Sequence, residues 1–325
     1  MDIGKLSTED LNKLINCNNV RRSDVRIKSK IGEDCSVINF GEYECVLSTD
    51  PITASDHNIG KLAVNVNVND IASCGVEPVG ILVTILAPQS ASIDDLKCIM
   101  NDISSETSKY NMEILGGHTE VTDSVNRIIV SCTVIGKCAK GKAISTSGAK
   151  KGDDIIVTGH IGYEGTSILA HDYEEKIKNI LTEKEIEEAK EYSNDISVLN
   201  TGLICGKFGV SSMHDITEGG LLGALYEMAD ASGVGFKIYK NKIPVSKVTR
   251  KICAGLGIDE LRFISSGSML IATKRGDILK NILSENNISS EIIGKITESG
   301  KILEDNGSEI KVEPPHSDEL YKIKR

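Results

Sequence analysis

The chain has 325 residues, of which 40% are hydrophobic and 26% charged, and its formal net charge is −10. This length and composition are typical of a folded protein with two domains. The negative charge argues against a surface for nucleic acid or anionic membrane, because phosphate binding on that scale requires clustered Lys and Arg. The most apolar stretch, residues 80–88, is much shorter than the ~20 residues of a membrane helix. Since the first residues also lack a basic region followed by an apolar run, we expect a cytoplasmic protein.

The cysteines and histidines do not have the spacing of a structural zinc site. The nine cysteines form no CxxC pair, and although Cys132 and Cys138 could share a metal, no companion pair accompanies them. We expect reduced cysteines that mostly pack in the core. Four histidines lie in or beside the motifs described below and are better candidates for acid–base or phosphate contacts: His57, His118, His160 and His214.

Alternating apolar residues bounded by turn formers predict strands in the first half of the chain. They cover residues 35–40, 43–50, 62–70, 80–88 and 126–138. Residues 92–110 have apolar positions at helical spacing, with Ser92 as the amino-terminal cap. Residues 60–75 are ambiguous, because their alternation suits a strand, whereas their Ala, Leu and Val content also permits a helix ending at Gly75. We favour a helix over the later part of this stretch.

Small, Gly and charged residues concentrate at positions 145–154, and we place the domain boundary there. The two predicted domains are residues 1–149 and 150–325. Strands predicted in the second domain cover residues 154–159, 235–243, 267–274 and 289–297, and helices cover 174–192, 219–235 and 277–287. Both halves mix strands and helices, so the predicted fold class is mixed α/β.

Carboxylates stand at the margins of several apolar elements in the first half. Glu33 and Asp34 precede one predicted strand, Asp50 and Asp70 end two others, and Glu120 follows another apolar segment. Their convergence would form a Mg²⁺ site, because this hard cation takes oxygen ligands and keeps waters and substrate phosphates in its shell. Each carboxylate taken alone is better explained as a cap or turn former.

The glycine-rich stretch GHIGYEG contains Gly159 and Gly162 between a predicted strand and a helix. Backbone N–H groups at such a helix start can approach a phosphate, although a tight strand-to-helix turn explains the glycines as well. A second stretch, HDITEGG, places acidic and hydroxyl side chains just before a helix that starts with two glycines. It offers either an anion site beside metal-binding carboxylates or an ordinary helix cap. Its residues are Asp215, Thr217, Glu218, Gly219 and Gly220.

Several stretches occur together in a specific order along nearly the whole chain. They are IGEDCSVI (31–38), STDP (48–51), HNIGKLAVNVNVNDIASCGVEP (57–78), GGHTE (116–120), TGHIGYEG (158–165), HDITEGGL (214–221) and SSGSMLIA (265–272). In this order they resemble the aminoimidazole ribonucleotide (AIR) synthetase superfamily, and most closely its hydrogenase-maturation branch, the HypE proteins.

The resemblance implies two α/β domains, a homodimer whose amino-terminal domains form a shared β-barrel, and ATP with Mg²⁺ bound in a cleft at or near that dimer interface. Carried onto matching positions, the metal ligands would be Asp34, Asp50, Asp70, Glu120, Asp215 and Glu218. The resemblance further implies nucleotide contacts from Asp34, Thr49, Asp50, Asn69, Gly116, Gly117, Gly159, Gly162, Thr217, Gly219 and Gly220. The second-domain motif is similar to that of the thiamine-monophosphate kinase branch.

Two departures from the family pattern concern the choice of branch. HypE proteins end in a Cys that accepts a carbamoyl group, whereas this sequence ends DELYKIKR and its last cysteine is Cys253. Selenophosphate synthetases use an amino-terminal Cys with a nearby Lys in a Gly-rich loop, which LINCNNVRR does not match. We therefore expect an AIR synthase-related protein of HypE type with an unassigned substrate.

The expected activity is Mg²⁺-dependent use of ATP to activate or phosphorylate an oxygen of a small or protein-borne substrate, with Asp70, His57 and Glu120 as catalytic residues. One alternative is a small-molecule kinase similar to thiamine-monophosphate kinase. Another is a nucleotide-binding protein that assists a maturation partner without catalysing a reaction itself.

Overall fold

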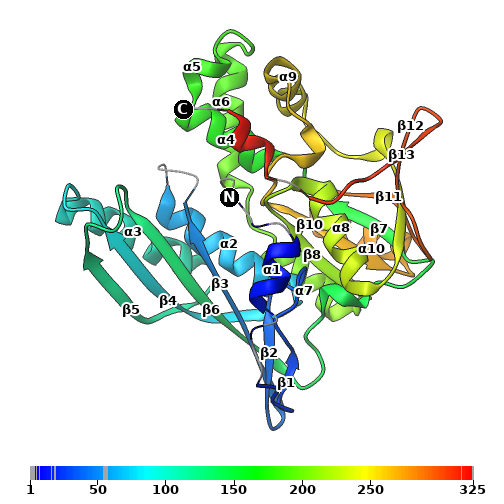
Figure 1. Cartoon of the computed structure of the whole chain (residues 1–325), viewed down its shortest axis with the longest axis horizontal. Helices are drawn as coiled ribbons and strands as arrows, with labels where there is room; N and C mark the ends of the chain where they lie inside the picture. The colour runs from blue at the N-terminus through cyan, green and yellow to red at the C-terminus, as the bar shows by residue number, and fades with distance from the viewer. Residues whose placement is uncertain are drawn as a thin grey trace.

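The computed structural model describes residues 4, 6, 8–15, 17, 20–53, 58–315 and 317–323, and it contains two β-sheets joined through a buried helix (Figure 1). The mixed α/β class predicted from the sequence is confirmed. The first sheet comes from residues 25–139 and the second from residues 154–311. The boundary proposed after residue 149 lies between them. In the described part of the chain, no helix is both long and apolar enough to cross a bilayer.

The first sheet has the strand order β1-β2-β3-β6-β4-β5, in which only β4 and β5 run parallel. Its strands are β1 (Val25–Ile27), β2 (Ser36–Phe40), β3 (Tyr43–Ile52), β4 (Glu77–Ala87), β5 (Glu113–Val121) and β6 (Ile129–Ala139). Helices α2 (Ile59–Ser73) and α3 (Ile93–Lys109) pack beside each other on it, while the short α1 (Thr8–Ile15) precedes the sheet. The predicted cap of α3 is confirmed, because Ser92 and Asp95 form a reciprocal capping box.

Helix α2 replaces the strand predicted for residues 62–70, so that prediction was wrong, whereas the helix favoured over the later part of residues 60–75 is confirmed. The helix is buried on nearly all sides, because it packs against β3 and β6 of the first sheet and against α7 and β8 of the second domain. A helix buried all round has no polar stripe, and the sequence therefore lacks the 3.6-residue period of a surface helix. Its alternating polar residues Asn65, Asn67 and Asn69 are buried and hydrogen-bonded to three different segments.

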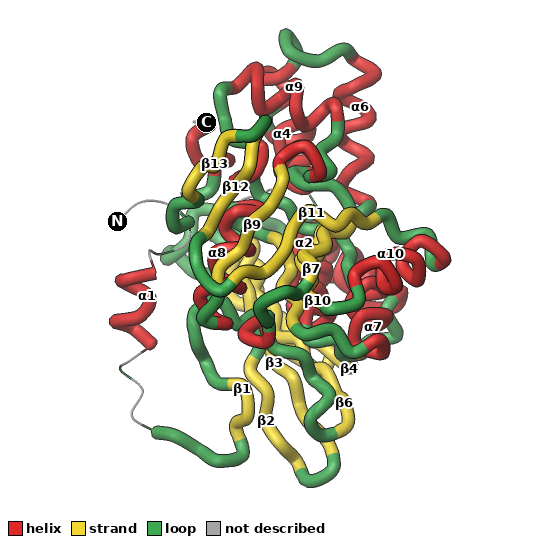
Figure 2. Tube along the Cα trace, turned by 90° about the vertical axis from the view of Figure 1, so that its right-hand side faces the viewer, coloured by secondary structure: helices red, strands yellow, loops and turns green. Residues whose placement is uncertain are grey.

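The second sheet has the order β13-β12-β9-β11-β7-β10-β8, antiparallel except for the β12 and β9 pair (Figure 2). Its strands are β7 (Asp154–Thr158), β8 (Ser212–Ile216), β9 (Gly235–Tyr239), β10 (Ser268–Thr273), β11 (Ser290–Thr297), β12 (Lys301–Asp305) and β13 (Ser308–Lys311). Its helices are α4 (Tyr163–Asp172), α5 (Glu174–Ile177), α6 (Glu183–Glu191), α7 (Leu199–Phe208), α8 (Gly220–Ser232), α9 (Lys247–Leu256) and α10 (Gly276–Glu285).

Strand β7 shows why the strands of the second domain have continuous apolar sequences instead of alternating ones. Ile155 and Val157 belong to a core formed with α8, whereas Ile156 belongs to a core on the other face that contains residues of α2, α7 and α10. Helices thus cover both faces of this strand. Because the second of these cores also contains residues of the first sheet, the two domains share one apolar interior around α2.

Close backbone contact holds α7 against α2. A Cβ atom at Gly202 would lie 2.1 Å from the carbonyl oxygen of Ala72, and one at Gly206 would lie 2.5 Å from that of Gly75. Only glycine allows this approach. The elements that were not predicted from the sequence are helices α1, α7 and α9 and strands β1, β5, β8, β12 and β13.

Candidate functional site

A cleft of about 860 Å³ opens between the two domains. This volume lies in the range of roughly 300–1,000 Å³ that small-molecule sites occupy. Among the described residues that line it, acidic side chains outnumber basic ones. The acidic residues are Glu33, Asp34, Asp50, Asp70, Glu164, Asp215, Glu218 and Glu227, and the basic residues are Lys30 and Arg127.

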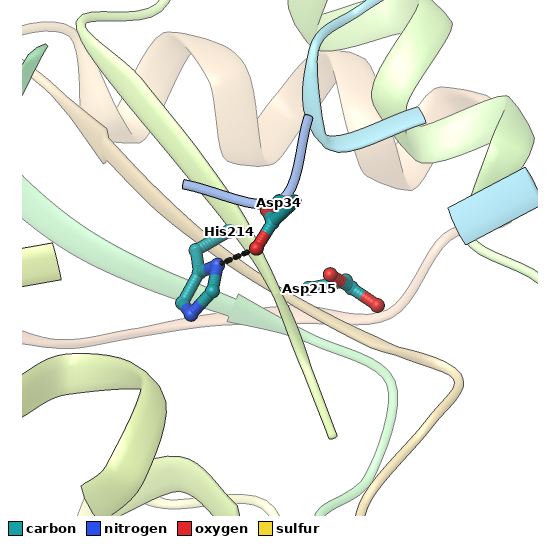
Figure 3. A group of neighbouring side chains, drawn as sticks. All are labelled: Asp34, His214 and Asp215. Atoms are coloured by element: carbon teal, nitrogen blue, oxygen red, sulfur yellow. Dashed lines mark ion pairs between the residues drawn. The ribbon is translucent and has the colours of Figure 1, made fainter. Parts of the chain in front are cut away.

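The centre of the cleft brings Asp34 of the first domain next to His214 and Asp215 of β8 (Figure 3). His214 and Asp215 are neighbours on β8, so their side chains point to opposite faces of the sheet. Because β8 is the edge strand of that sheet, Asp34 at this edge can still lie close to both of them. Ligand atoms of the three residues lie within 4.8 Å of one another. Asp34 Oδ2 and Asp215 Oδ2 are buried and have no hydrogen-bond partner in the described structure.

The surroundings of His214 favour an oxygen-coordinated cation over zinc. His214 Nδ1 forms a 2.6 Å ion pair with Asp34 Oδ1, and Nε2 lies 3.0 Å from Glu227 Oε2. Both ring nitrogens therefore face carboxylates, which leaves neither lone pair for a metal. Buried carboxylate oxygens without donors fit a hard cation such as Mg²⁺, which prefers oxygen ligands.

Asp50 and Asp70 line the same cleft from β3 and α2. The Ser48 hydroxyl donates to Asp70 Oδ2. Asn67 fixes the backbone of Asp50, because the Asp50 N–H donates to Asn67 Oδ1 at 2.8 Å and Asn67 Nδ2 donates to the Asp50 carbonyl at 3.2 Å. Asp50 and Asp70 thus stand on a strand and a helix rather than on loops.

The carboxylates influence one another electrostatically. Burial raises the pKa of Asp70 well above its usual range, and the charges of Asp215, Asp50 and Asp34 raise it further. Burial and the charge of Asp34 likewise raise the pKa of Asp215. Burial lowers the pKa of His214, but the Asp34 and Glu227 carboxylates outweigh it and raise that pKa overall. A bound cation would relieve this repulsion.

Of the residues proposed from the sequence, those lining the cleft are Asp34, Thr49, Asp50, Asp70, Asp215, Thr217 and Glu218. The Thr49 hydroxyl donates to the Cys132 carbonyl at 2.9 Å and accepts from the Thr133 hydroxyl, so it forms part of the wall. His57 lies outside the described residues.

Glu120, Gly116 and Gly117 lie elsewhere within the chain. All three are exposed on β5, the edge strand of the first sheet, and Glu120 lies 3.1 Å from His118. A Cβ atom at Gly117 would lie 1.8 Å from the Val83 carbonyl oxygen, so this glycine is required for the pairing of β5 with β4. The expected convergence of Glu120 with the other carboxylates does not occur within one chain.

The remaining proposed residues have structural roles near the cleft. Asn69 Nδ2 donates to the Ile196 carbonyl at 2.7 Å and Asn69 Oδ1 accepts from the Val198 N–H at 2.9 Å, which ties α2 to the second domain. Four glycines serve tight turns with positive φ: Gly159, Gly162, Gly219 and Gly220. The helix starts predicted at Gly162 and Gly219 are confirmed, since these residues cap α4 and α8.

Other lining residues were not proposed from the sequence. Glu164 is buried and accepts from the Ser266 N–H at 3.0 Å, and burial raises its pKa. Tyr321, near the end of the described chain, donates its hydroxyl to Glu218 Oε1 at 2.7 Å. Glu164 and Ser266 lie in the recognised stretches TGHIGYEG and SSGSMLIA, which was the available signal, whereas nothing in the sequence pattern marks Tyr321.

Comparison with known proteins identifies the family. The model of the AIR synthase related protein, N-terminal domain, matches residues 32–138, and that of the C-terminal domain matches residues 150–304. The chain belongs to the AIR synthase related family. Every aspartate at the centre of the cleft lies within these two matched regions.

This AIR synthase related protein is similar to hydrogenase-maturation proteins, HypE among them, and to a kinase. It is 33% identical to a putative hydrogenase expression/formation protein of Methanocaldococcus jannaschii, over 83% of this chain and 81% of that protein. It is 28% identical to the carbamoyl dehydratase HypE of Bradyrhizobium diazoefficiens, over 74% and 69% of the two chains. It is also 31% identical to thiamine-monophosphate kinase of Bacillus subtilis, over 59% and 58%.

Solved structures confirm the two-domain fold of the AIR synthetase superfamily, which is called the PurM-like fold. A chain from the crystal structure of a HypE–HypF complex superposes with a TM-score of 0.77 at 25% identity, covering 94% of this chain and 99% of that one. A HypE solved in complex with ATP has a TM-score of 0.69 at 19% identity, covering 94% and 90%, and shows the fold alone.

Proposed function

We propose that this protein is a Mg²⁺-dependent enzyme that uses ATP to activate or phosphorylate an oxygen of an acceptor in the interdomain cleft. The observation that carries the proposal is the meeting of Asp34, Asp50, Asp70 and Asp215 at one cleft, with buried oxygens of Asp34 and Asp215 lacking hydrogen-bond partners. The use of ATP is supported by the kinase among its relatives and by the HypE that was solved in complex with ATP.

The charge of the cleft supports a metal-bound nucleotide. A triphosphate facing this set of carboxylates would be repelled, since Lys30 and Arg127 are the only basic side chains among the described lining residues. Lys30 also donates to the Ala231 carbonyl at 2.8 Å. Mg²⁺ held by Asp34, Asp50, Asp70 and Asp215 would supply charge neutralisation on the phosphate oxygens.

The chain's own residues would orient the groups around this centre. Ser48 holds Asp70 and Asn67 holds the backbone of Asp50, so both carboxylates are positioned before the nucleotide binds. In the proposed transfer, an acceptor oxygen bonds to the γ-phosphorus, the bond from that phosphorus to the β,γ-bridging oxygen breaks, and ADP leaves.

The acceptor would bind to the part of the cleft wall made by two hydrogen-bonded pairs, Glu164 with Ser266 and Glu218 with Tyr321. Carboxylates, a phenol and a hydroxyl suit a substrate with N–H or O–H donors, such as an amide or carbamoyl group. Expected partners are this acceptor, a second copy of the chain and a maturation protein, as in the HypE–HypF complex. Because Glu120 lies on β5, away from the cleft of its own chain, it would contribute to a site only from the second copy of the homodimer.

A kinase similar to thiamine-monophosphate kinase is the second candidate, because the Bacillus subtilis enzyme is 31% identical over more than half of this chain. The two activities differ in their products. A kinase leaves a stable phosphorylated acceptor, whereas a dehydratase releases inorganic phosphate together with a dehydrated acceptor. A non-catalytic nucleotide-binding protein would form neither.

The test is phosphorus NMR of the purified protein with Mg²⁺-ATP and two acceptors, a peptide that ends in S-carbamoylcysteine and thiamine monophosphate. We expect ADP and phosphate to form with the peptide, and Asp215→Asn to abolish this turnover. A phosphorylated thiamine product would instead establish the kinase. ATP binding without any turnover, even after addition of a HypF protein, would reject catalysis.

A further inference from the structure

A line of buried side chains connects α8 of the second domain to the Asp34 loop of the first. Glu227 on α8 lies 3.0 Å from His214 Nε2, and His214 Nδ1 lies 2.6 Å from Asp34 Oδ1. The side chains of Glu227, His214 and Asp34 are only 10%, 6% and 8% exposed. Water therefore competes little with these contacts.

The two contacts determine how Asp34 presents its carboxylate. Since His214 pairs with Oδ1, the other oxygen, Oδ2, is left buried and without a hydrogen-bond partner in the described structure. The His214 ring is itself fixed from behind by Glu227, which sets both the rotation of the ring and the nitrogen that faces Asp34. A carboxylate–histidine pair of this kind orients ligands in metal sites.

Backbone contacts dock the same loop on the same helix. Gly32 has a φ of +81°, and a Cβ atom there would lie 3.0 Å from the Glu227 carbonyl oxygen. Lys30 Nζ donates to the Ala231 carbonyl at 2.8 Å, one turn further along α8. Helix α8 thus supports Asp34 through its side chain at 227 and through its backbone.

We propose that Glu227 is a positioning residue for the metal site, acting through His214 to hold Asp34 with Oδ2 facing the cation position beside Asp215. This inference rests on the proposed function. It assigns Glu227 and His214 to orientation of a ligand rather than to metal binding, and it makes cation affinity depend on α8, an element that contributes no ligand itself.

The experiment is a titration of the full-length protein with Mn²⁺ alone, in which the concentration of free Mn²⁺ is measured by electron paramagnetic resonance. Mn²⁺ takes the same oxygen ligands as Mg²⁺. We expect Glu227→Ala to raise the dissociation constant at least about tenfold, the usual effect of losing such a partner. Glu227→Gln should stay within about threefold of the wild type, because the amide can still bond to His214 Nε2 and leave the Nδ1 proton for Asp34.

A matched control is Asp230→Asn, which removes a carboxylate from the next turn of α8. Asp230 pairs with Lys301 at 2.5 Å and is 46% exposed, away from His214. It should leave the Mn²⁺ affinity unchanged. Equal weakening by Asp230→Asn and Glu227→Ala would mean that general negative charge, and not positioning, sets the affinity, and would overturn the inference.

A double-mutant cycle separates positioning from a merely structural role. If Glu227 acts through His214, Glu227→Ala should have almost no further effect on Mn²⁺ affinity once His214→Ala is present. Additive losses in the double variant would reject the inference, as would unchanged affinity in a folded Glu227→Ala protein. If Glu227→Ala does not fold, His214→Ala alone tests the contact with Asp34: it should raise the Mn²⁺ dissociation constant at least about tenfold, and unchanged affinity would reject the inference. Absence of Mn²⁺ binding by the wild type would reject the proposed function itself, and this inference with it.

Discussion

At the scale of single residues, Asp70 combines an unfavourable environment with a central position in the cleft. Burial, followed by the charges of Asp215, Asp50 and Asp34, raises its pKa in the folded state. A folded state that binds a proton more tightly than the unfolded state loses stability as pH rises above the unfolded pKa of ~3.9. The ionised carboxylate is therefore a cost to the metal-free protein at neutral pH, and a cation would offset it.

Replacing Asp70 by Asn should raise the stability of the metal-free protein and lower its ATP turnover. The amide oxygen can still accept from Ser48 while the charge is removed. We expect the melting temperature in EDTA to rise by roughly 1–2 °C at pH 8, which corresponds to about 1 kcal/mol for a chain of this length, and this gain to shrink towards pH 4, where the wild-type carboxyl is protonated. ATP turnover should fall at least about 100-fold. The exposed Asp123→Asn serves as the control, and wild-type turnover by Asp70→Asn would remove Asp70 from the site.

At the scale of elements, the sequence predicted the helices and strands that have one buried face and one exposed face. The capped helix 93–109 and the alternating strands 43–52 and 129–139 have one face in the core and one outside, so their periods are visible. Helix α2 could not be read this way, because it is buried all round and its three asparagines bond to partners distant in sequence. Strand β5 was missed because it is exposed along nearly its whole length.

The same distinction applies to the site. Asp34, Asp50, Asp70 and Asp215 were found because each lies in a specific motif. Glu227 was not, because its role depends on the distance from α8 to His214, which no local pattern encodes. Glu120 was grouped with the cleft carboxylates because it also follows an apolar segment, but β5 carries it to the outer edge of the sheet.

The short helix Glu319–Lys322 should dock against the cleft in a pH-dependent way. Asp318 Oδ2 accepts from the Gly219 N–H at 2.7 Å, and burial raises the pKa of Asp318 to about 7. Because the docked state favours the protonated acid, docking should weaken as pH rises from about 4 to about 7 and then level off. Hydrogen exchange of residues 319–323, corrected for intrinsic rates, should be faster at pH 8 than at pH 5.5. Asp318→Asn should abolish the difference, and equal protection of the wild type at both pH values would contradict the prediction.

At the scale of the whole molecule, the acidic cleft lies between two domains that share one core. Asp34 and Asp50 come from the first domain and Asp215 from the second, so a cation held by them would join the domains directly. Helix α2 already connects them through the shared core and through Asn69, whose side chain bonds to the Ile196 carbonyl and the Val198 N–H. Ligand binding at the cleft should therefore stabilise the two domains together rather than one of them.

We expect ATP to bind only together with a divalent cation. Without one, the nucleotide meets ionised carboxylates, and calorimetry in EDTA should detect no binding. With Mg²⁺ present, ATP at about 100 times its dissociation constant should stabilise the folded protein by about 2.7 kcal/mol. The thermal transition should rise as a single step, because the ligand bridges both domains. ATP binding of equal strength in EDTA and in Mg²⁺ would show that the carboxylates do not act through a metal, and a transition that splits into two steps on addition of Mg²⁺-ATP would place the nucleotide in one domain alone.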